Sequence, residues 1–333
     1  MAGSTGRYGA EDPEHYERPR RRTRPRTKER PSYDDAVPAV VVTVDRGRYT
    51  CRLADDPQVV VTAMKSRPLG RKGVVVGDRV RLVGDSSGAE GTLARIVLVD
   101  ERVTVLRRTA DDDDPVERVI VANADQLVVV VALADPPPRQ GLVDRALVAA
   151  YDAGMDPLLC LTKADLADPE PVLAGYRPLD VPYVVTQRGE DVTPLLQRLQ
   201  GRTSVMLGHS GVGKSTLVNA LVPDAHRSTG GVNVVTGRGR HTSTSALMLT
   251  LPRGDGWIVD TPGIRSFGLA HVDPAQLIEA FEDLHELTWS CPRGCTHGEG
   301  EPECGLDDAT GTQAERVASF RRLLASREAA QEW

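Results

Sequence analysis

The chain has 333 residues, of which 40% are hydrophobic and 26% are charged. This length predicts two or three domains and is sufficient for a substantial buried core. No apolar run approaches the roughly 20 residues of a membrane-spanning helix, and the first thirty residues are too polar for a secretory signal. Five cysteines, three of them between residues 291 and 304, do not fit a disulfide scaffold and favour a reducing, cytoplasmic location.

The net charge of −6 is unevenly distributed along the chain. Arg18 to Arg30 carries eight basic residues against Glu29 alone, a local charge of +7, so the remaining chain is about −13. Such a run buries too little apolar surface to fold, and residues 1–36 are therefore predicted to be a disordered basic tail. We expect the tail to contact nucleic acid, and a purely solubilising tail is the alternative.

Residues 37–108 alternate in the manner of short β-strands. The candidate strands lie in "AVVVTVDRGRYTCRL", "QVVVTAM", "GDRVRLVG" and "GTLARIVLVDERVTVLRR". Their spacing predicts a small all-β barrel like the oligonucleotide-binding (OB) fold, with RNA binding as the hypothesis and a plain packing domain as the alternative. Basic residues in the loop from Arg67 to Lys72 are candidate RNA contacts. The acidic run from Asp111 to Asp114 is predicted to be a linker.

From residue 115 to 270 the pattern is that of an α/β domain. "RVIVANA" and "QLVVVVALA" are nearly continuous apolar runs, as expected for parallel strands that are covered on both faces. Helical and strand-like stretches then alternate, which predicts a parallel sheet. They are "GLVDRALVAAYDAG", "DPLLCLTKADL", "VPYVVTQ", "VTPLLQRLQ" and "RTSVMLG".

The stretch that follows the last of these strands matches the phosphate-loop motif G-x-x-x-x-G-K-[ST] in full. An apolar strand precedes it and the helical "STLVNAL" follows, which is the context that the motif requires. Backbone N–H groups would surround the phosphates, while Lys214 would reach the β- and γ-phosphates and Ser215 would hold Mg²⁺. The predicted nucleotide-binding residues here are Gly208, His209, Ser210, Gly211, Val212, Gly213, Lys214, Ser215 and Thr216.

Two further motifs predict the rest of a nucleotide site. "GWIVDTPG" supplies Asp260, a second group expected near the magnesium ion, and Gly263, whose backbone N–H would contact the γ-phosphate. No base-reading N-K-x-D motif follows the phosphate loop, but Thr162, Lys163 and Asp165 match it upstream. The Asp165 carboxylate would accept hydrogen bonds from the N1–H and the 2-amino group of guanine, and adenine has neither donor. The order of motifs therefore predicts a circularly permuted GTPase.

The C-terminal residues 271–333 are predicted to be a helical zinc-binding domain. Helical stretches flank the spacing Cys291-x₃-Cys295-x-His297-x₆-Cys304, and tetrahedral Cys₃His sets of this kind hold structural zinc. Glu299, Glu301 and Glu303 are interpreted as solvated rather than as ligands. Cys51 and Cys160 lie in predicted strands and are expected to be buried.

These motifs together resemble one family. The order T-K-x-D, GHSGVGKST, GRGRHTST, DTPG and Cys-Cys-His-Cys is similar to that of the RsgA (YjeQ) family of ribosome small-subunit GTPases, over roughly residues 37 to 325. The resemblance implies an OB barrel, a permuted GTPase core and a C-terminal zinc domain. It also implies a role in late maturation of the small (30S) ribosomal subunit, which would stimulate GTP hydrolysis.

The expected catalytic group lies between the phosphate loop and Asp260. Ile264 occupies the position at which Ras-like enzymes carry a water-orienting Gln, so hydrolysis by the isolated protein is expected to be slow. Lys214 of the phosphate loop is one predicted catalytic residue, and the resemblance places a catalytic histidine at His241 and a magnesium-binding hydroxyl just after it. That hydroxyl belongs to Thr242 or Thr244, and the resemblance favours Thr244. A histidine that contacts rRNA is the alternative for His241.

The leading interpretation is an enzyme that hydrolyses GTP to GDP and phosphate on the assembling small subunit, with magnesium at the nucleotide and one structural zinc. Its partners would be the subunit and its rRNA, with no membrane, and the protein would be a monomer. The alternative is a nucleotide-gated rRNA-binding module whose hydrolysis is incidental. An ATP-dependent kinase is disfavoured, because Asp165 should select guanine and no phospho-acceptor pocket is evident.

Overall fold

The computed structural model describes residues 33–70, 73–109, 117–223, 246–261, 269 and 272–327. The predicted basic tail up to residue 32, the acidic run 111–114 and the last two residues of the loop ending at Lys72 lie outside these ranges. All elements described below belong to the unit Asp35–Trp333. Within the described ranges, no helix has the length and apolar character that a membrane span requires.

The N-terminal strands form a closed five-stranded barrel. Its strands are β1 (Val37–Asp45), β2 (Arg48–Leu53), β3 (Val60–Lys65), β4 (Arg79–Gly84) and β5 (Ala94–Val99). They are hydrogen-bonded in the order β1-β2-β3-β5-β4, and β4 pairs back onto β1. Inward-facing side chains such as Val41, Cys51, Val61 and Ile96 are fully buried and fill the interior. The predicted OB-like barrel is confirmed, and the basic loop after β3 contains a short 3₁₀ turn, η1 (Arg67–Leu69).

A two-stranded antiparallel ribbon follows the barrel. It consists of β6 (Val105–Thr109) and β7 (Glu117–Ala122). The prediction that "RVIVANA" forms a strand of the parallel sheet was therefore wrong. A short β-branched run has no periodicity that distinguishes a parallel strand from one arm of a ribbon, and here the pairing partner is the segment immediately upstream.

The central sheet has the order β10-β9-β8-β11-β13-β12. Every neighbouring pair is parallel except β12 with β13. Its strands are β8 (Gln126–Ala132), β9 (Asp156–Thr162), β10 (Tyr183–Val185), β11 (Thr203–Leu207), β12 (Leu247–Thr250) and β13 (Trp257–Asp260). β8 is buried at every position, as expected for a central parallel strand.

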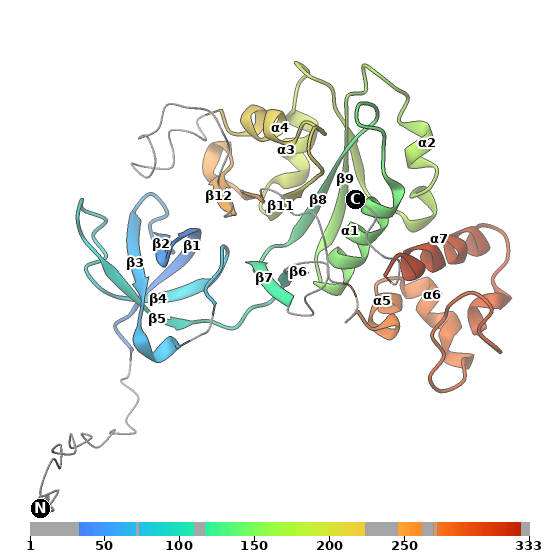
Figure 1. Cartoon of the computed structure of the whole chain (residues 1–333), viewed down its shortest axis with the longest axis horizontal. Coiled ribbons are helices and arrows are strands. Elements are labelled where there is room, and N and C mark those ends of the chain that lie inside the picture. The colour runs from blue at the N-terminus through green and yellow to red at the C-terminus, as the bar shows by residue number, and fades with distance from the viewer. Residues whose placement is uncertain are drawn as a thin grey trace, which may run out of the picture. The chain divides into compact units, whose positions relative to one another are not determined.

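Helices cover both faces of this sheet (Figure 1). Val129 and Val131 of β8 belong to the same apolar cluster as α1 (Gln140–Asp152). The alternate residues Val128 and Val130 belong to the cluster that contains α3 (Thr193–Leu199) and α4 (Lys214–Leu221). The connections also include α2 (Glu170–Leu173), η2 (Arg177–Leu179) and η3 (Pro252–Gly254). The predicted α/β core is confirmed.

The C-terminal part is helical. It contains α5 (Pro274–Glu279), α6 (Glu282–Leu287), η4 (Thr288–Ser290), η5 (Gly305–Asp308) and α7 (Thr312–Ser326). The helical stretch that begins at residue 274 is interrupted at Phe281, whose backbone angles, φ −124° and ψ 78°, are not helical. At this break the buried Phe281 ring packs edge-on against Tyr151 of α1 and Phe320 of α7, with 5.0 Å and 5.5 Å between the ring centres. Packing against two other helices thus overrides helix continuity.

Candidate functional site

The predicted phosphate loop joins β11 to α4. Val212 points into the core, whereas Ser210, Ser215 and Thr216 are exposed. Gly213, directly before α4, has φ +94°, a conformation that glycine adopts without the strain a side chain would introduce. Its conformation turns the chain into the first helical residue, Lys214, so that backbone N–H groups and the positive helix end face the same space.

Lys214 contacts the end of a neighbouring strand. Its ammonium forms an ion pair with Asp260, the last residue of β13, and donates to the carbonyl oxygen of Thr261 at 3.2 Å. The Thr261 hydroxyl donates in turn to the carbonyl oxygen of Met206 in β11, at 2.8 Å. The two motifs predicted for phosphate and metal, far apart in sequence, are therefore adjacent in space. The sequence motifs did not indicate Thr261, because its role depends on contacts of its backbone carbonyl and its hydroxyl.

The predicted base-reading motif lies at the end of β9. Thr162 is buried, and its hydroxyl donates to the carbonyl oxygen of Val212 at 2.6 Å. Lys163 has φ +61°, and its ammonium donates to the carbonyl oxygen of Asp135. Asp165 is exposed to solvent. The motif is thus tied directly to the phosphate loop, and Asp135 is a contact that no sequence pattern indicated.

The strand order explains why these motifs converge. β9, β11 and β13 run parallel within one sheet, so their carboxyl ends share one edge, which is where α/β sheets bind ligands. The structure brings together Thr162, Lys163, residues 208–216 and Asp260 at this edge. Gly263, Ile264, His241, Thr242 and Thr244 lie outside the described residues.

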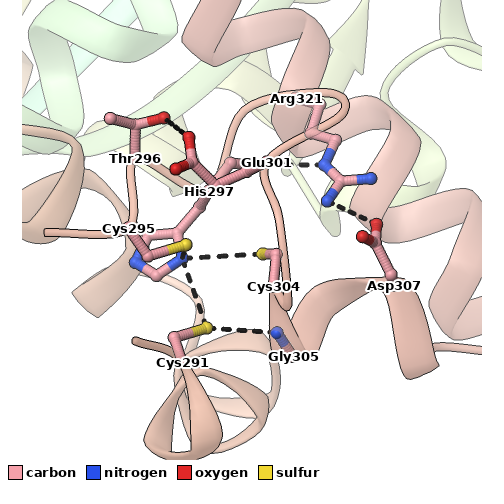
Figure 2. A network of polar contacts seen from close by, with 9 residues as sticks. All are labelled: Cys291, Cys295, Thr296, His297, Glu301, Cys304, Gly305, Asp307 and Arg321. Atoms are coloured by element: carbon pink, nitrogen blue, oxygen red, sulfur yellow. Dashed lines mark hydrogen bonds and ion pairs between the residues drawn. The ribbon is translucent and has the colours of Figure 1, made fainter. Parts of the chain in front are cut away.

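The four predicted metal ligands form a compact group (Figure 2). Their ligand atoms all lie within 4.8 Å of one another. The His297 Nδ1 atom is 3.7 Å from Cys291 Sγ, 3.4 Å from Cys295 Sγ and 3.9 Å from Cys304 Sγ. A tetrahedral zinc with Zn–S near 2.3 Å and Zn–N near 2.0 Å separates its ligands by about 3.5–3.8 Å. The donor set and its spacing therefore fit a structural zinc ion.

Neighbouring groups orient these ligands. The Gly305 N–H donates to Cys291 Sγ at 3.1 Å, and Arg321 Nε donates to the carbonyl oxygen of His297 at 3.2 Å. Burial lowers the pKa of His297, which favours the neutral imidazole that a metal requires. Glu299 and Glu303 are exposed, and Glu301 accepts from Thr296. The candidate metal group comprises the three cysteines and the histidine, as predicted.

The comparisons with known proteins agree with these motifs. A family profile described as RsgA GTPase matches residues 99–270. A small ribosomal subunit biogenesis GTPase RsgA from Pseudomonas syringae pv. tomato is 40% identical over 266 residues, which are 76% of this chain and 75% of the relative. The protein of the same name from Ectopseudomonas mendocina is 43% identical over 219 residues, 62% of this chain and 63% of the relative. The match thus spans less than two thirds of the latter protein.

Two solved structures share the fold. YjeQ from Thermotoga maritima is 26% identical with a TM-score of 0.62, over 86% of this chain and 98% of that one. YloQ, described as a circularly permuted GTPase, has a TM-score of 0.61 at 21% identity, over 90% of this chain and 99% of that one. The profile covers half of the chain and the Pseudomonas syringae relative covers three quarters of it, and the site has the motif order of a permuted GTPase. The chain therefore belongs to the RsgA GTPase family.

Proposed function

We propose that this GTPase hydrolyses GTP to GDP and phosphate during maturation of the small ribosomal subunit, and that the subunit stimulates its turnover. The relatives from Pseudomonas syringae and Ectopseudomonas mendocina are named for biogenesis of that subunit. The observation that carries the proposal is the hydrogen bond from Thr162 to the Val212 carbonyl. It joins a base-reading motif to a phosphate loop in one site, which a generic phosphate-binding turn would not need.

In this proposal each motif has one role. The backbone of residues 208–216 binds the phosphates, Lys214 neutralises charge that develops on them, and Ser215 and Thr244 supply hydroxyls to magnesium. Asp165 reads the guanine edge, with Lys163 along the base plane. Gly263 contacts the γ-phosphate and His241 orients the attacking water. The ion pair between Asp260 and Lys214 supports this assignment, because P-loop enzymes hold magnesium with an Asp near the phosphate-binding Lys.

The partners follow from the same chemistry. The barrel, the zinc domain and the basic tail would bind rRNA. The protein would act as a monomer in the cytoplasm. Contact would be confined to basic loops and the tail, because the rest of the chain carries about −13 charge (−6 minus +7). Counterion release then makes binding to the subunit strongly dependent on salt.

The test is turnover of GTP and of ATP, each with and without small ribosomal subunits. The proposal expects slow GTP turnover by the protein alone, strong stimulation by subunits and little use of ATP. Flat, slow GTP turnover together with tight, nucleotide-dependent subunit binding would instead favour the RNA-binding module. Equal turnover of ATP would exclude Asp165 as the base reader.

A further inference from the structure

The loop after β9, which carries the base-reading motif, is hydrogen-bonded directly to the loop that follows β10. The backbone N–H of Ala164 donates to the carbonyl oxygen of Thr186 at 3.3 Å, and the N–H of Thr186 donates to Leu161 at 2.7 Å. The chain between these loops, residues 166–182, contains α2 and η2. The connecting segment therefore joins two loops that contact each other through their backbones.

The connecting segment is held from outside the GTPase core by helix α7. Arg322 Nη2 donates to the carbonyl oxygen of Gly175 at 2.8 Å, and its guanidinium lies 5.3 Å from the centre of the Tyr176 ring. Arg316 Nη1 donates to the carbonyl oxygen of Pro178 at 2.6 Å and pairs with Asp180 at 2.6 Å. Two arginines, six residues or about 1.7 helical turns apart, thus bind backbone carbonyls at two points of the connecting segment.

Helix α7 is also held by three further contacts. Arg322 Nε pairs with Asp144 of α1 at 3.1 Å, where the carboxylate side chain is only 4% exposed. The adjacent Arg321 reaches the metal-binding loop through the His297 carbonyl, as Figure 2 shows. Phe320, fully buried, packs against Phe281. The helix therefore links the zinc-binding loop to the connecting segment through adjacent side chains.

We propose that α7 is a positioning element for guanine recognition, with Arg316 and Arg322 as its positioning residues. By holding Gly175–Asp180 they fix the spacing of the loops at Asp165 and Thr186, and so the distance from the Asp165 carboxylate to the 2-amino group of the base. The phosphate contacts are made by a different loop, residues 208–216, so a change confined to the base edge should appear in the ratio of affinities for two bases rather than in the affinity alone. The inference depends on the proposed base-reading role of Asp165.

The test compares GDP with inosine diphosphate, which lacks the 2-amino group, as ligands of the full-length, zinc-loaded protein. The unchanged chain should bind GDP about 10- to 100-fold more tightly, because one donor to a carboxylate is lost. In Arg316→Gln/Arg322→Gln the ratio of the two dissociation constants should fall at least about fivefold. Arg198→Gln, an exposed position on α3, should leave the ratio unchanged. If the double variant does not fold, Arg316→Gln alone serves, since its Asp180 partner is 82% exposed.

The outcomes separate the two proposals. A ratio near one in the unchanged chain would refute the role of Asp165, and with it this inference. A normal ratio in the unchanged chain that persists in the folded double variant would overturn the role of α7 alone. Equal weakening of both ligands would also overturn it, because partial loss of folded protein lowers both affinities by the same factor.

Discussion

The Thr162 hydroxyl donates to the carbonyl oxygen of Val212 at 2.6 Å, joining the end of β9 to the phosphate loop. Thr162 occupies the position at which base-reading motifs of this type usually carry Asn. The shorter side chain still makes such a bond. Both groups are buried, so neither has a competing partner in water.

Replacing Thr162 by Val should weaken nucleotide binding. Valine has nearly the same shape but no hydroxyl, so the Val212 carbonyl would lose its partner, at a cost of about 1–3 kcal/mol. We expect the dissociation constant for GDP to rise about tenfold, measured by fluorescent-nucleotide titration. Thr162→Ser keeps the hydroxyl and should stay within about threefold of the original protein. Equal affinity in all three proteins would mean that this bond does not position the loop.

Replacing His241 by Ala should reduce turnover without reducing binding. If His241 orients the attacking water, its loss should lower subunit-stimulated GTP turnover about 10²- to 10⁴-fold, while the dissociation constant for GDP is unchanged. Full stimulated turnover in the variant would remove His241 from the mechanism. Normal turnover with weaker subunit binding would support the alternative of an rRNA contact.

The contiguous motifs predicted the permuted core and the metal ligands, because each sets its local backbone through glycines and ligand spacing within a few residues. The direction of β7 and the break at Phe281 were not predicted, because they depend on tertiary partners. β7 pairs with β6, and Phe281 packs between Tyr151 and Phe320. The contacts of α7 with Gly175 and Pro178 were beyond sequence reasoning for the same reason, since their acceptors are backbone carbonyls.

Thiol alkylation should distinguish the cysteines buried in strands from the cysteines of the metal-binding loop. Burial raises the pKa of Cys51 and of Cys160 to about 12, so at pH 8 only about one molecule in ten thousand carries either thiolate. Cys291, Cys295 and Cys304 are expected to be protected by zinc instead. Iodoacetamide at pH 8 should therefore label none of the five cysteines in the native, zinc-loaded protein.

Removal of zinc by a chelator should change this pattern in a defined way. The three cysteines of the metal loop should become labelled, and the C-terminal part should lose structure, while Cys51 and Cys160 stay protected until denaturant is added. Peptide mass spectrometry reads each site separately. Labelling of the loop cysteines without chelation, in protein that contains stoichiometric zinc, would show that they do not hold the metal.

Gly305→Ala should weaken zinc binding. The Gly305 N–H donates to Cys291 Sγ, and a Cβ at this position would collide with the carbonyl oxygen of Leu287. Loss of such an outer contact typically costs about 10- to 100-fold in metal affinity, which competition with a chromogenic chelator would measure. Gly298→Ala in the same loop is the control, because a Cβ there meets only Thr296 Oγ1 at 3.5 Å. Equal zinc affinity in both variants would refute the role of Gly305.

The ion pair between Arg102 and Asp78 should stabilise the barrel more than any exposed pair of the same type. Arg102 Nε and Nη2 donate to the two Asp78 oxygens at 2.7 and 2.8 Å, and Nη2 also reaches the carbonyl of Gly73. The Asp78 side chain is fully buried while Arg102 is 22% exposed. Arg102→Ala would leave a buried carboxylate that, among the described residues, keeps the Val75 N–H as its side-chain donor, which should cost about 3–5 kcal/mol.

The matched control for this loss is Arg81→Ala in the same barrel. Arg81 pairs with Asp100 at 3.4 Å, with side chains 41% and 28% exposed, and pairs of that kind contribute about 0–1 kcal/mol. Hydrogen exchange of the barrel strands, followed by mass spectrometry, would measure both variants without assuming that the whole chain unfolds in one step. Faster exchange of β1 and β4 should appear in Arg102→Ala alone. Similar exchange in the two variants would mean that burial adds nothing to the Arg102–Asp78 pair, since burial is the property in which the two pairs differ most.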